Sequence, residues 1–206
     1  MIHKDWSDVN LAAYRYYAPR AIEHWAGRRK KPSKFLKRFA HGLPKGGALF
    51  DYGCGIGTDL AWLQAKGFRV AGMDGTADFV AEARRRNPGV RIAHSRFEIF
   101  RLPDARYDGI WSNATLMHLT PAVFRQHLRK LERALKPGGV LGVVLPWGRK
   151  KGIARSDWIP GRYMACYTNP EAARFFKGWS MKFLKTIVND DRNGRWIQIL
   201  AQKKNV

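Results

Sequence analysis

The sequence predicts an α/β fold in which a mostly parallel β-sheet carries helices on both faces. Three observations lead to this prediction. Short apolar runs typical of buried strands alternate along the chain with amphipathic segments typical of helices. The first buried run leads directly into a glycine-rich turn and a helix. Near the C-terminus, two strand-like segments flank Asn193-Gly194, a strong hairpin signal. We therefore expect parallel strands with right-handed helical crossovers, followed by a hairpin.

The first 44 residues have a helical and basic character. Residues 10–18 are rich in helix-forming and aromatic residues, and Pro19 is placed to begin a second helix. A basic loop is expected at 27–32, followed by a short amphipathic helix at 35–39. These segments precede the first strand.

The middle of the chain alternates strands and helices, and its turn residues mark where each helix ends. Gly67 is expected to end the first of these helices, and Asn87-Pro88-Gly89 the second. We predict strands at 48–52, 68–74, 90–94, 107–112 and 140–145, and helices at 58–66, 77–86 and 121–135.

The last part of the chain begins with a long basic loop at 146–163. A short helix at 170–176 and two strands, 181–188 and 195–202, follow it, which brings the predicted sheet to seven strands. The chain is long enough for one domain with a proper core, so we expect a single domain, 1–206. Its parts are a basic helical extension at 1–44, a ligand-binding core at 45–147 and a basic C-terminal part at 148–206.

Residues 48–57 form the most informative motif. An apolar run ends in Asp51, and glycines follow at positions 53, 55 and 57 before a helix opens at Thr58. Such a turn offers free backbone N–H groups to a ligand. A dinucleotide is disfavoured, because the third glycine of its fingerprint is missing in both registers and because Asp51 would repel a pyrophosphate. A cofactor with a cationic amino-acid end and a nucleoside end fits better, and S-adenosylmethionine is such a molecule.

A second acid strengthens this interpretation. Asp74 ends the next predicted strand and lies 19 positions after Gly55. Nucleotide-binding βαβ units place the carboxylate that accepts from ribose hydroxyls at about this spacing. We therefore expect Asp74 to bind the ribose, and Asp51 to contact the charged end of the cofactor.

These motifs together resemble the class I S-adenosylmethionine-dependent methyltransferases over the length of the chain. The segment 51–57 is similar to their first motif, 72–74 to their ribose-binding acid, 107–118 to their fourth-strand motif and 135–140 to the turn before their fifth strand. The resemblance implies a Rossmann-like, mostly parallel sheet with an antiparallel last strand, and S-adenosyl-L-methionine as the cofactor. It does not fix the methyl acceptor.

The resemblance also implies which residues line the cofactor pocket. Family members often place an acid near the adenine where this chain has Arg96, so that role passes to the neighbouring Phe97 and Glu98. An aromatic residue of the N-terminal helix often covers the cofactor, although helical aromatics are also typical of a core. No metal site is expected. The implied cofactor-binding residues are Tyr14, Tyr17, Asp51, Gly53, Cys54, Gly55, Gly57, Asp74, Gly75, Phe97, Glu98, Asn113 and Ala114.

His118 is the candidate catalytic residue. It follows the fourth predicted strand, near the place where an acceptor would meet the methyl group. A histidine there can take the acceptor's proton near neutral pH. A helix-capping or packing role is equally compatible with this position.

The chain is strongly basic, with a formal net charge of +22. Residues 1–50 carry 11 Lys or Arg and 3 acids, and residues 148–206 carry 13 and 4, so the excess lies at the two ends. Such a field favours anionic partners, including RNA, although a solubilising surface charge is the alternative explanation. The basic runs 28–31 and 149–151 are open to the same two interpretations.

Three functional hypotheses remain open. The first is a methyltransferase acting on a small, anionic or aromatic acceptor, the second a tRNA methyltransferase using the basic ends, and the third a non-catalytic S-adenosylmethionine-binding protein. With two cysteines, no run of 18 apolar residues and no signal-like N-terminus, a cytoplasmic protein without a membrane span is expected. The oligomeric state is left open.

Overall fold

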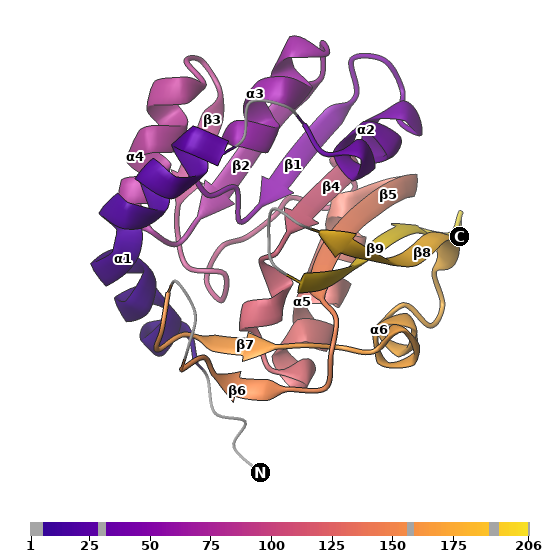
Figure 1. Ribbon diagram of the computed structural model, residues 1–206. Coiled ribbons are helices and arrows are strands. Elements are labelled where there is room, and N and C mark those ends of the chain that lie inside the picture. The colour runs from indigo at the N-terminus through magenta and orange to yellow at the C-terminus, as the bar shows by residue number, and fades with distance from the viewer. Residues whose placement is uncertain (1–5, 29–31, 156–158, 190–193, 206) are drawn as a thin grey trace.

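The computed structural model describes residues 6–28, 32–155, 159–189 and 194–205, and it contains the predicted seven-stranded sheet (Figure 1). The strands are β1 (Ala48–Tyr52), β2 (Arg69–Asp74), β3 (Arg91–His94), β4 (Tyr107–Asn113), β5 (Leu135–Pro146), β8 (Ser180–Asn189) and β9 (Gly194–Gln202). Their order is β3-β2-β1-β4-β5-β9-β8. The first five strands are parallel, and β9 is antiparallel to both β5 and β8. The predicted fold class is therefore confirmed.

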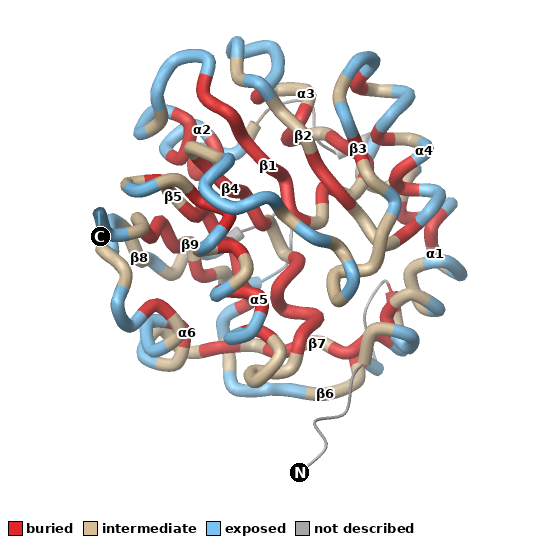
Figure 2. The backbone as a smooth tube through the Cα atoms, turned by 180° about the vertical axis from the view of Figure 1, so that it is seen from behind, coloured by how far each residue is buried: buried red, intermediate tan, exposed pale blue. Residues whose placement is uncertain are grey.

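Helices cover both faces of the sheet. They are α1 (Ser7–Arg28), α2 (Lys34–His41), α3 (Thr58–Ala65), α4 (Ala77–Arg86), the 3-10 turn η1 (Leu116–His118), α5 (Pro121–Ala134) and α6 (Asn169–Phe175). Successive residues of β1 point to opposite faces. Leu49 joins a core cluster with residues of α2 and α3, whereas Phe50 joins the cluster that contains Phe124 and Leu131 of α5. All five residues of β1 are buried, as Figure 2 shows from the side of α5.

Local signals explain where several helices begin and end. Thr120 caps α5 by accepting from the Val123 N–H, and Pro121 stands at the first position of that helix. Gly67 ends α3 with a φ of 85°, as predicted. The N–H of Phe68 then bonds back to the Leu63 carbonyl, the pattern of a glycine-terminated helix.

Two predictions about the first part of the chain are wrong. Pro19 does not begin a helix but lies inside the continuous α1, where the buried neighbours Ala18 and Ala21 hold both halves against one apolar cluster. The predicted basic loop at 27–32 begins within this helix, and residues 29–31 lie outside the described residues.

The predicted loop at 146–163 contains strand β6 (Lys151–Ile153), and β7 (Tyr163–Ala165) begins where it ends. The two pair antiparallel as a second, small sheet, which we call the β6–β7 ribbon. Basic residues and short strands hide its pattern in the sequence. The predicted hairpin turn between β8 and β9 lies largely outside the described residues, since 190–193 are not among them.

Within the described part of the chain, no helix combines the length and the apolar character needed to span a membrane. The parallel strands end at one edge of the sheet, and α1 and the β6–β7 ribbon lie at this edge (Figure 1). Ligands of open α/β sheets bind at that edge, beyond the carboxyl ends of the strands.

Candidate cofactor and acceptor site

The glycine turn after β1 needs glycine for two different reasons. Gly53, Gly55 and Gly57 have φ values of 84°, 53° and 77°. A Cβ at Gly53 would lie 2.3 Å from Thr115, and one at Gly57 would lie 2.4 Å from Asn87 Nδ2. A Cβ at Gly55 would meet only a ring atom of α1, at 3.7 Å. Packing therefore leaves no room for a side chain at positions 53 and 57, whereas a ligand could approach the backbone closely at Gly55.

The two predicted acids lie at the ends of neighbouring strands, next to this turn. Asp51 of β1 is 3% exposed. Asp74 of β2 accepts from the Gly55 N–H through one carboxylate oxygen and from the Thr76 N–H through the other, each at 2.9 Å. Burial raises the pKa of Asp74, while these backbone donors act against that rise. Asp74 thus holds the glycine turn through these backbone donors.

The pKa of the Cys54 thiol reflects the negative charge of both acids. Its side chain is buried within the turn. Burial raises the pKa of the Cys54 thiol well above its usual value, and the negative charges of Asp51 and Asp74 raise it further. The site is therefore a negatively charged place that favours the cationic end of a ligand.

Helix α1 covers the turn and the end of β2. A Cβ at Gly75 would lie 2.9 Å from Leu11. Tyr14 and Tyr17 belong to an apolar cluster with Ile56 of the turn and Phe79 of α4. Tyr14 therefore has the packing role that the sequence left open, and its role as a cover over the cofactor stays a prediction. Tyr17 shares that cluster, and its contact with a cofactor stays a prediction.

The end of β4 is bonded to the same turn. Asp59 of α3 accepts from Trp111 Nε1 and from the Asn113 carboxamide, each at 2.9 Å. Ala114 follows with a φ of 59°, in the left-handed region that few non-glycine residues occupy. Thr115 Oγ1 donates to the Gly53 carbonyl at 3.2 Å. Asn113 and Ala114 thus lie beside the turn, with one donor of Asn113 used by Asp59, and their contacts with a cofactor stay predictions.

The predicted adenine contacts lie in the segment after β3. Phe97 packs against the rings of Tyr52 and His127. Glu98 accepts from the Ser7 hydroxyl at the start of α1 and pairs with Arg96 at 3.4 Å. This segment therefore ties α1 to the sheet, and the contacts of Phe97 and Glu98 with adenine stay predictions.

His118 is fixed by hydrogen bonds at both ring nitrogens. Its Nδ1 lies 2.9 Å from the Tyr163 carbonyl, and its Nε2 lies 2.7 Å from the Tyr14 hydroxyl. A carbonyl only accepts, so Nδ1 carries the proton, and the neutral ring then accepts from Tyr14 through Nε2. Burial lowers the pKa of His118 to about 3, and the positive charge of Arg162 acts in the same direction. The imidazole is therefore neutral at physiological pH.

Two residues that the sequence did not single out complete this arrangement. Buried Asn10 of α1 donates to the His118 carbonyl at 2.9 Å and accepts from the Tyr163 N–H at 2.6 Å. Arg162 is 4% exposed, and its guanidinium carbon lies 5.7 Å from the centre of the Tyr14 ring. Neither Asn10 nor Arg162 is part of a recognisable motif, so only the fold, which brings them to His118 and Tyr14, identifies them.

S-adenosylmethionine fits the residues around the turn. Asp51 would supply a buried carboxylate for a cationic amino-acid end, and Asp74 would supply acceptors for ribose hydroxyls. Gly55 leaves backbone accessible beside both. No group of three or more metal-ligand side chains occurs among the described residues.

Comparison with known proteins places these elements in a family. Residues 49–139 match the family model of a methyltransferase domain. A trans-aconitate 2-methyltransferase of Variovorax paradoxus is 31% identical over 150 residues, which are 72% of this chain and 54% of that protein. A malonyl-[acyl-carrier protein] O-methyltransferase of Enterobacter lignolyticus is 29% identical over 132 residues, which are 63% of this chain and 50% of that protein. The chain thus spans about half the length of these curated relatives.

Solved structures share the fold. The 1,6-didemethyltoxoflavin-N1-methyltransferase of Burkholderia thailandensis, solved with its substrate and S-adenosylhomocysteine, superposes with a TM-score of 0.77 at 17% identity, covering 99% of this chain and 92% of that one. The [4+2]-cyclase SpnF superposes with a TM-score of 0.75 at 15% identity, covering 100% and 98%. The part of the chain that contains β1 to β4, the glycine turn and both acids thus matches a methyltransferase domain, and the seven-stranded fold is the one that the class I S-adenosylmethionine-dependent methyltransferases share.

Proposed function

We propose that this chain transfers a methyl group from S-adenosylmethionine to a small-molecule acceptor. The observation that carries the proposal is the pair of acids, Asp51 and Asp74, at adjacent strand ends around a turn whose outer glycine is open. The relatives support it, because both are named as methyltransferases of small or carrier-bound acids. The single-domain organisation and a cytoplasmic location remain part of the proposal.

Each element has a defined task in this reaction. When bound, S-adenosylmethionine supplies a methyl group on a cationic sulfur that is a good leaving group. Asp74 holds the nucleoside, Asp51 the amino-acid end, and α1 excludes water. Orientation of reactants alone can lower a barrier by about 7–11 kcal/mol, so alignment and water exclusion are the main requirements.

The test is calorimetry with S-adenosylhomocysteine. Asp74→Asn should weaken binding by at least about 10-fold, since a hydrogen bond to a charged group contributes about 1.5–3 kcal/mol. Asp104→Asn, which removes the same charge from an exposed loop, is the matched control and should bind like the wild type. Wild-type protein that binds neither S-adenosylmethionine nor its demethylated product would refute the proposal.

The net charge of +22 favours one alternative, a tRNA methyltransferase. Basic residues that contact several phosphates would release counterions, so tRNA affinity would fall steeply as salt is added. Filter binding of tRNA over a salt series, together with a labelled methyl transfer assay, distinguishes the two functions. Retention of tRNA at low salt without methylation would count as non-specific attraction and favour the small-molecule acceptor. Binding of cofactor without turnover on any acceptor would instead support a non-catalytic binding protein.

A further inference from the structure

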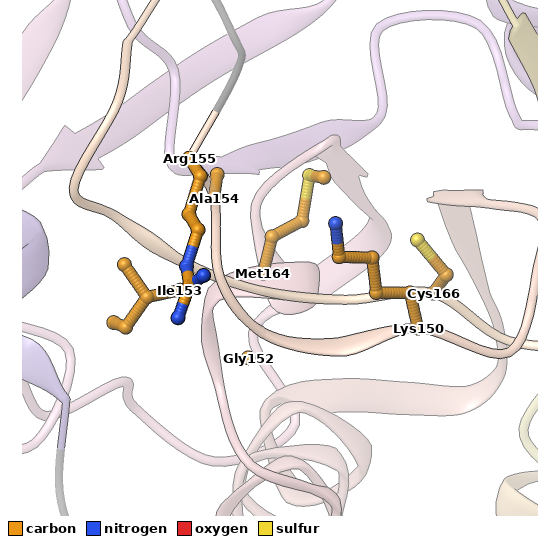
Figure 3. A pocket seen from close by; sticks show the side chains of 7 residues that line it. All are labelled: Lys150, Gly152, Ile153, Ala154, Arg155, Met164 and Cys166. Carbon is orange, nitrogen blue, oxygen red and sulfur yellow. The ribbon is translucent and has the colours of Figure 1, made fainter.

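We propose that the β6–β7 ribbon binds a small organic acid in a pocket of its own, with the carboxylate at a basic rim and the carbon chain against an apolar floor. The pocket has a volume of about 70 Å³ and is shown in Figure 3. It is lined by Lys150, Gly152, Ile153, Ala154, Arg155, Met164 and Cys166. This inference goes beyond the proposed function, because the pocket shares no lining residue with the glycine turn.

The hollow in the ribbon has a cause in the sequence. Side chains alternate between the two faces of a strand. Tyr163 and Ala165 of β7 are buried, whereas Met164 between them lines the pocket. Gly152 of β6 is paired with Met164, and a Cβ at Gly152 would meet nothing within 4 Å. A missing side chain in the middle of the ribbon therefore leaves a space that a ligand can fill.

Backbone hydrogen bonds fix the shape of this hollow. Beyond one end of the paired strands, the Cys166 N–H donates to the Lys150 carbonyl at 2.8 Å. Beyond the other end, the Ala154 N–H donates to the Arg162 carbonyl, also at 2.8 Å. The ladder thus continues on both sides of the pocket. A ligand would bind to a backbone that is already ordered, which lowers the entropic cost of binding.

Two cations at the rim supply the charge that an acid requires. Lys150 and Arg155 are both exposed, and within the described part of the chain neither side chain forms a hydrogen bond or an ion pair. Lys151 differs, because it pairs with Glu171 at 3.1 Å and its ammonium lies 5.0 Å from the centre of the Tyr167 ring. The charges of Lys150 and Arg155 are therefore available to a carboxylate.

The floor of the pocket is apolar, which selects an organic anion. Figure 3 shows the sulfur atoms of Met164 and Cys166 on the same side of the ribbon as the Lys150 amine, and Ile153 beside the Arg155 guanidinium. Burial raises the pKa of the Cys166 thiol, although nearby lysine ammonium groups act against the rise, so the thiol is neutral at physiological pH. A carbon chain would cover this surface, whereas an inorganic anion would leave it in water.

The experiment is NMR of protein labelled with ¹³C at the methionine methyl groups. The Met164 signal reports the pocket, and those of the buried Met73 and Met117 report the fold. Butyrate should shift the Met164 signal in a saturable way. It should bind at least about 5-fold more tightly than butyramide, as expected for an exposed charge pair. From acetate to butyrate, binding should tighten by up to about 4-fold for each methylene that the floor covers.

The variants compare equal changes of net charge at and away from the pocket. The double variant Lys150→Gln, Arg155→Gln removes both cations of the rim. The matched control, Lys151→Gln with Arg174→Gln, removes the neighbouring lysine and an exposed arginine of α6, neither of which lines the pocket. The first variant should lose the preference for butyrate over butyramide, whereas the control should keep it.

Three results would overturn this inference. The first is equal binding of butyrate and butyramide to the wild-type protein. The second is binding of inorganic phosphate as tight as that of butyrate, because the pocket would then attract any anion. The third is unchanged butyrate binding in the rim variant, with the Met73 and Met117 signals in place. None of these results involves S-adenosylhomocysteine, whose binding tests the proposed function separately.

Discussion

His118 is the residue whose chemistry depends most on its surroundings. In the sequence it is a histidine after a strand, suited to take a proton near neutral pH. In the folded chain its two nitrogens are bonded to the Tyr163 carbonyl and the Tyr14 hydroxyl, and the neighbouring charge is the cation of Arg162. To act directly as a base, His118 would need a pKa far above its value of about 3. Its geometry instead suits the orientation of Tyr14, so its catalytic role stays a prediction.

The lowered pKa of His118 predicts a pH dependence of stability. The unfolded histidine takes up a proton below about pH 6.5, whereas the folded one does so only near pH 3. The stabilisation is therefore complete above pH 6.5, and it is lost as the pH falls from 6.5 towards 3, by up to about 1.4 kcal/mol per pH unit. Urea unfolding at pH 7.5 and pH 5.5 should show a smaller decrease for His118→Gln than for the wild type. Equal decreases would contradict the assigned environment.

Two glycines of similar backbone conformation, one in the glycine turn and one after α3, should differ in how much stability is lost on replacement by alanine. Gly57 and Gly67 have φ values of 77° and 85°, but a Cβ would clash with Asn87 at the first and meet nothing within 4 Å at the second. Gly67→Ala should lower the free energy of unfolding by about 1–2 kcal/mol, the cost of the left-handed conformation. Gly57→Ala should lose about 1–3 kcal/mol more through overpacking. Urea unfolding measures both, and equal losses would show that the turn relaxes freely.

At the scale of elements, α1 decides whether the site is closed. It crosses from the end of β2, where Leu11 meets Gly75, to the turn, where Trp25 faces Gly55. The Glu98 segment and Asn10 bind its N-terminal half to the rest of the molecule. If the cofactor binds at the glycine turn as proposed, it has to enter beneath α1, so α1 is the element expected to move during turnover.

We expect Asn10 to hold α1 against the rest of the molecule. Asn10→Leu leaves the His118 carbonyl and the Tyr163 N–H without their partner, which costs about 1–3 kcal/mol for each buried group. We expect faster amide hydrogen exchange in α1 and faster release of S-adenosylhomocysteine, with the exchange of β1 unchanged. Ala12→Leu, at an exposed position of the same helix, is the control. Unchanged exchange in α1 would show that other contacts hold it.

At the scale of the whole molecule, the charge of +22 sets how anions approach. The long-range field raises the rate of encounter with an anionic acceptor and is screened by salt within about 10 Å at 0.1 M. The proposed chemical step, in contrast, would take place beneath α1, where salt screens charges less.

This difference predicts a split in the kinetic constants. With a carboxylate acceptor, kcat/KM should fall several-fold between low and physiological ionic strength, while kcat stays nearly constant. With an uncharged acceptor, both constants should be insensitive to salt. Steady-state kinetics over a NaCl series provides the measurement. If kcat fell as much as kcat/KM, salt would be acting on the reaction in the site and not on the rate of encounter.

The sequence by itself determined the sheet, the glycine turn and the two acids. These features are local: the strand, turn, helix and second acid occupy one run from Ala48 to Asp74, and periodicity and turn chemistry act over such distances. The resemblance of four motifs in this run and beyond it also indicated the cofactor, and residues 49–139 match a methyltransferase domain.

Only the tertiary structure decided what surrounds Tyr14 and His118. Tyr14 meets His118 across 104 positions and Asn10 meets Tyr163 across 153, and no local pattern encodes such a contact. The β6–β7 ribbon has strands of three residues, too short for a visible alternation, and it forms because β7 also packs against η1. Whether Arg162 is a solvated surface charge or a buried one depends on α1 closing over it, because burial is a property of the assembled fold and not of the residue.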